Sequence, residues 1–180
     1  MKSLHYICKK LTIITFFQMK YLEIKTRISV CQPHELSEKE MQVVNAAKEA
    51  CNSSYSPYSQ FSVGVALLLS DGKVVIGSNQ ENAAYPSGMC AERVALYQAG
   101  ALFPKTPITI MAIAARTQEG FTPHPCTPCG ACRQVMLESE LRQNGQPIQM
   151  VLYGTQECYR INDGTQALLP LQFNHKTMNL

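Results

Sequence analysis

Residues 61–98 read FSVGVALLLSDGKVVIGSNQENAAYPSGMCAERVALYQ. The two apolar runs on either side of Asp71-Gly72 predict a β-hairpin, because this dipeptide is typical of tight turns between strands. The polar stretch that follows contains Pro86 and reads as a loop. A helix is then expected to begin at Cys90, with Gly100 as its stop signal. This stretch therefore predicts a hairpin, a loop and a helix that starts at a cysteine.

The flanking sequence adds two helices and two strands. Ser37-Glu-Lys-Glu40 is a capping-box pattern, and a helical period follows it to about Asn52. The apolar stretches 108–115 and 148–153 read as buried strands, and a helix that starts near Pro128 lies between them. Two strand–helix alternations after a hairpin predict an α/β fold. We expect a three-layer α/β/α sandwich around a mixed sheet of about five strands.

Length and charge limit the classes of function. The 180 residues suit one domain, with 46% hydrophobic and 16% charged residues. The net charge is +3, but the first twenty residues hold four lysines and no acidic residue. Residues 21–180 are therefore slightly acidic overall and lack the excess of basic side chains that binds a nucleic-acid backbone. We expect a small substrate, no nucleic acid and no membrane partner.

The N-terminus carries a short apolar run, 11–17, after two lysines. Seven residues are too few to span a bilayer, and no small-residue cleavage site follows. We expect residues 1–20 to be a dispensable extension, from an upstream start with Met19 as the natural start; a targeting segment is the alternative. Residues 21–180 are expected to form the single domain.

The eight cysteines divide into two groups. Cys8, Cys31, Cys51 and Cys158 are isolated and read as ordinary buried or partly buried thiols. The other four are Cys90 and the cluster at 126, 129 and 132. Tight spacing at a helix start favours a metal over a disulfide framework. That interpretation implies a reducing compartment, and we expect a cytoplasmic protein.

Cys90, Cys129 and Cys132 are the candidate zinc ligands. Catalytic zinc usually takes three protein ligands and keeps one position open. Both cysteine motifs start helices on the same edge of the predicted sheet, where helix dipoles stabilise thiolates. Three thiolates leave a net negative site, and three side chains next to the motifs could compensate or donate to it: Arg93, Arg133 and Gln134. For the two arginines, a solvated helix face is the alternative.

Glu92 is the candidate proton carrier. On the first turn of its helix it can approach the metal without being a ligand, and can act as a general base and then a general acid. The alternative is that a glutamate is favoured there by the helix dipole alone. Cys126 and His124 are further possible ligands, but Cys126 lies outside the P-C-x-x-C frame and His124 reads as an exposed loop residue.

Cys90-Ala-Glu92 and Pro128-Cys-Gly-Ala-Cys132 together resemble the zinc-dependent nucleoside and nucleobase deaminases. The general pattern is H-x-E followed by P-C-x-x-C, with the glutamate as general acid and base. Cysteine in place of the histidine matches the three-cysteine branch that includes the small, tetrameric cytidine deaminases. The resemblance runs from about Met41 to Phe173. It includes the segments Tyr58-Ser-Gln-Phe-Ser-Val-Gly64, Asn79-Gln-Glu-Asn-Ala-Ala-Tyr85 and Cys129-Gly-Ala-Cys-Arg-Gln134.

The resemblance implies one zinc ion per subunit and hydrolytic deamination of cytidine and deoxycytidine, with shared active sites in a homotetramer. It also implies roles in binding: Asn79 and Glu81 for the ribose hydroxyls, Phe61 and the backbone of Ala91 for the base, and Phe173 for a neighbouring subunit's base. Three of these side chains have a plainer alternative. Asn79 would cap a turn, Glu81 would lie on the surface, and Phe61 would belong to the core.

Two rival functions differ from nucleoside deamination. The first rival is a deaminase that acts on a base in RNA or DNA, or on another small aminopyrimidine or an antibiotic. A deaminase of RNA or DNA needs a basic groove, and a slightly acidic body lacks the charge for one. A structural zinc module that only binds a partner usually closes its site with four ligands, and this sequence offers three that are well placed.

Overall fold

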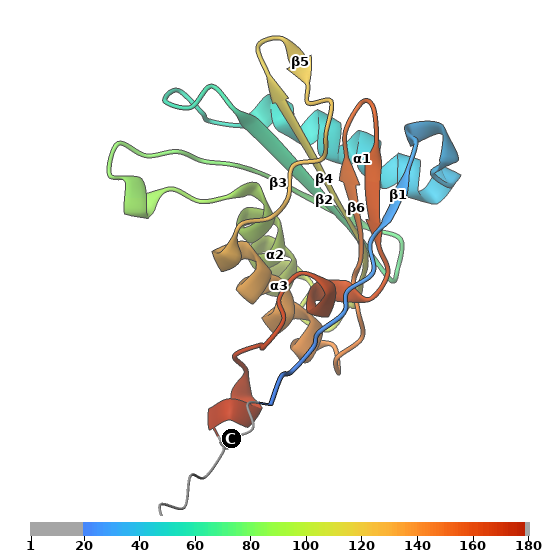
Figure 1. The fold of residues 1–180 in the computed structure, drawn as a ribbon. Helices are drawn as coiled ribbons and strands as arrows, with labels where there is room; N and C mark the ends of the chain where they lie inside the picture. Colours follow the sequence, from blue (N-terminus) through green and yellow to red (C-terminus); the bar gives the residue numbers. More distant parts are fainter. Residues whose placement is uncertain (1–19, 179–180) are drawn as a thin grey trace, which may run out of the picture.

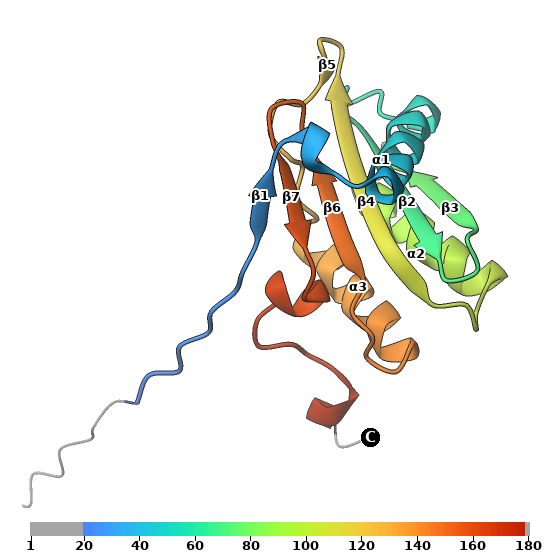
Figure 2. The same ribbon diagram turned by 90° about the vertical axis from the view of Figure 1, so that its right-hand side faces the viewer.

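The computed structural model describes residues 20–178, which form one mixed sheet with helices on both faces (Figure 1). The strand order is β1-β7-β6-β4-β2-β3, and β5 pairs with β4. Helix α1 covers one face, while α2 and α3 lie side by side on the other (Figures 1 and 2). The expected three-layer α/β/α sandwich is therefore confirmed. The expected extension over residues 1–20 lies outside the described residues, apart from Lys20.

The elements have the following bounds. The helices are α1 Glu38–Ala50, α2 Ala91–Leu102 and α3 Gly130–Arg142. The strands are β1 Ser29–Cys31, β2 Ser62–Leu69, β3 Val74–Ser78, β4 Ile108–Thr117, β5 Gly120–Phe121, β6 Gln149–Tyr153 and β7 Cys158–Ile161.

The sheet has seven strands rather than about five. All four strands expected from the apolar runs are present, and the additional ones are β1, β5 and β7. These three have two to four residues each. Segments of this length are too short to show the alternation of apolar and polar residues that marks a strand. They are strands because they pair with neighbouring strands, and the sequence does not reveal that pairing. Among the strands of residues 20–178, only β4 and β6 pair in parallel, and helix α3 lies in the connection between them.

Strand β4 shows why the central strands read as continuous apolar runs. Met111 and Ile113 pack on the face covered by α2 and α3, whereas Ile110, Ala112 and Ala114 pack on the face covered by α1. Because both faces are covered, successive side chains all need to be apolar. The sequence pattern thus reports the layering directly.

Gly100 does not stop helix α2, contrary to expectation. The helix continues through Gly100 to Leu102. A Cβ atom at Gly100 would lie 3.0 Å from a terminal guanidinium nitrogen of Arg142 in α3. The glycine therefore makes room for a close neighbour rather than for a left-handed turn.

Gly77 brings helix α2 onto strand β3. A Cβ atom at this position would lie 2.5 Å from the amide nitrogen of Ala95 and 2.7 Å from the carbonyl oxygen of Ala91. Real Cβ atoms do not approach backbone this closely, so only glycine allows this packing distance. The contact is one turn from the start of α2, and it fixes how that end of the helix sits on the sheet.

A largely buried ion pair joins α1 to strand β7. The Glu40 carboxylate, 5% exposed, accepts hydrogen bonds from both Nε and a terminal nitrogen of Arg160 in β7, at 2.6 and 2.9 Å. It also accepts from Gln149 and from the backbone N–H of Ser37, which completes the expected capping box. Burial alone would raise the pKa of Glu40, but the hydrogen bonds from Arg160 and Ser37 outweigh it and the pKa is lowered.

We expect Glu40→Gln to lower the free energy of unfolding at pH 7 by about 2 kcal/mol, because Arg160 loses its charged partner. Since the pKa of Glu40 is lower in the folded state, its contribution is complete above the unfolded pKa and is lost as pH falls through the folded pKa. Urea unfolding of both proteins from pH 7 to pH 3 should therefore show the difference shrinking in acid. Glu38→Gln, at an exposed position in the same turn, is the control; an equal loss there would contradict the prediction.

Candidate metal centre and active site

The first turns of α2 and α3 bring three thiols together. Cys90 is the N-cap of α2, Cys129 is the N-cap of α3, and Cys132 lies one turn into α3. The Sγ atoms of Cys90 and Cys129 are 4.0 Å apart, those of Cys129 and Cys132 are 3.4 Å apart, and all three lie within 4.8 Å of one another. Two segments 39 residues apart in the sequence therefore form one cluster.

This donor set suits zinc. Zinc–sulfur bonds of roughly 2.3 Å in a tetrahedron place the sulfurs about 3.8 Å apart, which is close to the spacing found here. Within residues 20–178, no fourth histidine, cysteine or carboxylate joins the group. Three ligands leave one coordination position for a small molecule, as in catalytic rather than structural sites.

The thiols differ in their electrostatics. Burial and the nearby Glu92 raise the pKa of Cys132. For Cys129, burial acts in the same direction, but the backbone and side chain of Cys132 donate to its sulfur and lower its pKa overall. A helix N-terminus favours the thiolate in the same way.

Cys126 and His124 do not belong to the cluster. Cys126 is half-buried outside the group of three, and burial raises its pKa to about 11. His124 is exposed, and its Nδ1 lies 3.1 Å from a carboxylate oxygen of Glu157. Both placements agree with the interpretation that neither residue is a ligand.

Glu92 lies beside the thiols in the first turn of α2 and is only 5% exposed. Burial raises the pKa of its carboxyl group, while a hydrogen bond from Cys132 and the charge of Arg93 act in the opposite direction. A buried carboxyl group next to a metal-binding cluster is well placed to accept and return a proton.

The three side chains expected to compensate the thiolates have different partners. A terminal nitrogen of Arg93 lies 3.9 Å from the Cys90 sulfur. Arg133 instead donates to the carbonyl oxygens of Pro128 and Leu168, and Gln134 donates to the carbonyl oxygen of Phe173. Within the described residues, only Arg93 of these three has a hydrogen bond to a cysteine sulfur.

A cleft of about 560 Å³ opens beside the cluster. Two hydrogen bonds between Gln80 and Met89 close the loop that leads to α2, so Asn79 and Cys90 stand next to each other at its base. Asn79, Glu81, Cys90 and Arg93 all line the cleft. The two residues expected to bind the sugar, Asn79 and Glu81, thus line the same cleft as the metal ligand Cys90.

Hydrogen bonds hold both expected sugar-binding side chains in place. Asn79 Oδ1 accepts from the Ser54 hydroxyl and the Val63 N–H, and its Nδ2 donates to the carbonyl oxygen of Phe61. One carboxylate oxygen of Glu81 accepts from the backbone N–H groups of residues 58 and 59. Its other oxygen has no such partner within the described residues. Asn79 therefore has the turn-stabilising contacts of its plainer alternative, while Glu81 keeps an acceptor for a ligand.

The remaining expected contacts have different exposures. Ala91 is fully buried at the start of α2, Phe61 is half-buried just before β2, and Phe173 is 57% exposed on the C-terminal segment. The cleft also has two aromatic residues to which the sequence assigns no role, Tyr58 and Tyr85, whose rings pack edge to face at 6.1 Å. Their presence in two of the motif segments was the available signal.

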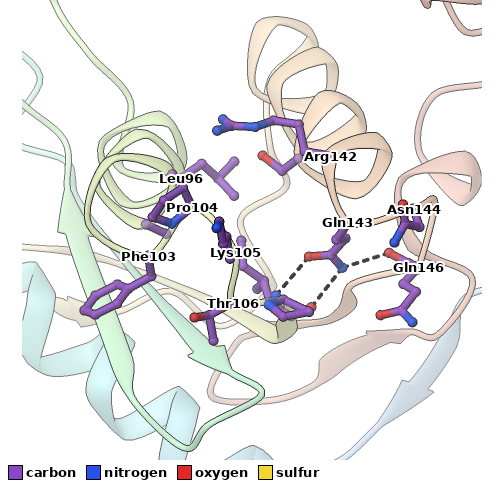
Figure 3. Close-up of a pocket in the computed structure, with 14 residues that line it drawn as sticks. Leu96, Phe103, Pro104, Lys105, Thr106, Arg142, Gln143, Asn144 and Gln146 are labelled. Carbon is purple, nitrogen blue, oxygen red and sulfur yellow. Dashed lines mark hydrogen bonds between the residues drawn. The ribbon is translucent and has the colours of Figure 1, made fainter.

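A second cavity, of about 190 Å³, lies away from this site (Figure 3). The C-terminal ends of α2 and α3 border it, and Gln143 bonds to the backbone of Ile108 across it. Figure 3 shows Arg142 and Lys105 at its rim. Both helices point their dipole-negative ends toward this cavity, opposite to the ends that carry the cysteines.

Residues 37–144 match the family model described as the cytidine and deoxycytidylate deaminase zinc-binding region. The chain belongs to this family. A curated cytidine deaminase of Halalkalibacterium halodurans is 44% identical over 96 residues, which cover 53% of this chain and 68% of the relative. One from Sporosarcina psychrophila is 43% identical over 96 residues, covering 53% and 66%.

A crystal structure of cytidine deaminase from Burkholderia pseudomallei superposes with a TM-score of 0.63 at 37% identity. The match covers 77% of this chain and all of that one. Family membership and the three-thiol cluster together identify zinc as the cofactor, one ion per subunit. None of the helices in residues 20–178 has the length and apolar character needed to cross a membrane.

We expect the wild-type deaminase-family protein to bind one zinc ion per chain, and Cys132→Ser to lose it, because the fully buried Cys132 thiol closes the cluster. Cys126→Ser is the matched control and should retain full zinc content. Release of zinc to a chromogenic chelator, counted per chain, measures both. Loss of zinc from the Cys126 variant, with retention in the Cys132 variant, would reverse the assignment.

Proposed function

We propose that this chain hydrolyses cytidine and deoxycytidine to uridine and deoxyuridine with release of ammonia, a step of pyrimidine salvage. The observation that carries the proposal is the buried Glu92 carboxyl group beside the Cys90, Cys129 and Cys132 cluster. The substrate class is supported by the curated relatives and the solved structures that are named as cytidine deaminases.

Glu92 performs the proton transfers in this proposal. When bound by the three thiols, zinc supplies Lewis acidity that makes a water molecule nucleophilic at neutral pH. Glu92 takes a proton from the attacking water and delivers one to N3 of the base. The water oxygen then bonds to C4, and Glu92 takes the second proton from that oxygen and passes it to the amino group. The C4–N bond breaks, and ammonia leaves.

The chain's other residues bind and orient the nucleoside. Asn79 and Glu81 are proposed to hold the sugar hydroxyls, supported by their position on the cleft wall that also carries Cys90. The half-buried ring of Phe61 and the backbone of Ala91 would contact the base. Arg93 is proposed to compensate the thiolate charge, supported by its contact with the Cys90 sulfur. Deamination of a base within RNA or DNA is disfavoured because the body of the chain lacks a basic excess.

We also propose a homotetramer with shared active sites. Its support is the family resemblance, together with the exposure of Phe173 and Tyr85, two large aromatic side chains that a single chain leaves uncovered. A fully active species with the mass of one 20.0 kDa chain in light scattering would contradict this proposal. The seven cysteines of the described part are all free thiols, which supports a reducing cytoplasmic location.

We expect Glu92→Gln to reduce ammonia release from cytidine by roughly a thousandfold or more while zinc content stays at one per chain, because the amide cannot carry the proton. Enzyme-coupled ammonia detection and zinc analysis on the same samples measure both. A zinc-loaded wild type that is inactive on cytidine refutes the substrate claim. An active Glu92 variant refutes the role of Glu92.

Glu81→Gln should raise the KM for cytidine by about tenfold with a smaller change in kcat, because a neutral amide bonds a sugar hydroxyl more weakly than a carboxylate does. The amide oxygen can still accept from the N–H groups of residues 58 and 59, so the loop is preserved. Glu119→Gln, at an exposed position on the β4–β5 turn, is the control. An unchanged KM would place Glu81 outside the binding site.

A further inference from the structure

Arg133 joins two segments that are distant in the sequence. Its Nε donates to the carbonyl oxygen of Pro128 and its Nη1 donates to the carbonyl oxygen of Leu168, both at 2.8 Å. Pro128 is buried and directly precedes the metal ligand Cys129. Leu168 is buried in the core cluster beneath α3, at the start of the C-terminal segment 168–173. One side chain therefore connects the backbone leading into the cluster with that segment.

Gln134 makes a second connection to the same segment. Its side-chain nitrogen donates to the carbonyl oxygen of Phe173 at 2.9 Å. Between the two anchors, Leu171 has a φ of +55°, in the left-handed region that a side chain disfavours. A conformation of this kind persists only where its surroundings hold it. The two neighbouring residues of α3 provide such a hold at each end of the segment.

These contacts differ from those of a charge compensator. Both acceptors of Arg133 are neutral carbonyl oxygens, whereas Arg93 is the arginine that reaches a cysteine sulfur. A guanidinium group can donate in two fixed directions at once, and a lysine of the same charge cannot reproduce that fork. The need for arginine at this position is therefore geometric.

We propose that Arg133, assisted by Gln134, is a positioning residue that fixes the C-terminal segment 168–173 against the start of α3, at a set place relative to the metal ligands. Under the proposed function, on which this inference rests, the segment is thereby held where Phe173 can reach the base bound by a neighbouring subunit. Loosening it weakens substrate binding more than it slows the chemistry.

Arg133→Lys separates the two roles because it keeps the charge and loses the fork. We expect amide hydrogen exchange at Leu168 and Leu169, whose N–H groups donate to the carbonyl oxygen of Thr165, to become at least about tenfold faster, as for a lost hydrogen bond to a charged donor. The KM for cytidine should rise several-fold, with kcat and zinc content close to wild type. Gln134→Met, which removes the donor to Phe173 without adding a charge, should give a smaller change in the same direction.

Arg142→Lys is the matched control on the same helix, because Arg142 is an exposed residue whose guanidinium group lies against Gly100 and has no hydrogen-bond partner within residues 20–178. Unchanged exchange in Arg133→Lys would overturn the proposal, as would loss of zinc without faster exchange, which is the result expected of a compensator. Faster amide exchange with an unchanged KM would show that Arg133 holds the segment without affecting substrate binding, and this result would also overturn the proposal. If the wild type fails to deaminate cytidine, the proposed function fails, while the exchange measurement still tests the connection.

Discussion

At Gly77 the backbone of strand β3 touches the backbone of helix α2, and the placement of the reactive groups depends on this contact. A side chain there would overlap the amide of Ala95 and push the helix away from the sheet. Cys90 and Glu92 occupy the first positions of that helix, so a shift of the helix axis would move both relative to α3. The distance between the thiols is thus set by strand–helix packing as well as by the cysteine motifs.

The site also depends on where the two helices begin. Cys90 and Cys129 are N-caps, so each thiol stands at the end of a helix where backbone N–H groups are unpaired. These groups and the helix dipoles favour negative charge, while the burial of Glu92 and Cys132 disfavours it. The loop closed by Gln80 and Met89 adds the cleft lined by Asn79 and Glu81 beside the cluster. The three thiols, the buried Glu92 carboxyl group and the cleft of the proposed substrate therefore lie together at one edge of the sheet.

Much of this arrangement could be predicted from the sequence. The hairpin, the central strands and the N-caps follow from local patterns, and the spacing of Cys90, Cys129 and Cys132 identifies their cluster. Strands β1 and β7 could not be predicted, because three or four residues carry no period and their pairing is determined across the whole chain. Gly100 was misread as a helix end, since a glycine that admits a neighbouring arginine has the same local appearance as a cap. The partners of Arg133 were likewise beyond the sequence, because both are backbone atoms.

Strand β1 has a consequence for the order of events during synthesis. Cys31 lies opposite Cys158 in the register of β1 and β7, so this pair of strands closes a loop of more than a hundred residues. A ribosome releases β1 first and its partner after α1, α2, α3 and the central strands. The cysteines of both metal-binding motifs have therefore already emerged while β1 still has no strand to pair with. Of the strands in residues 20–178, β1 is made first but cannot pair with β7 until β7 has been made, and until then its unpaired backbone can pair with another nascent chain.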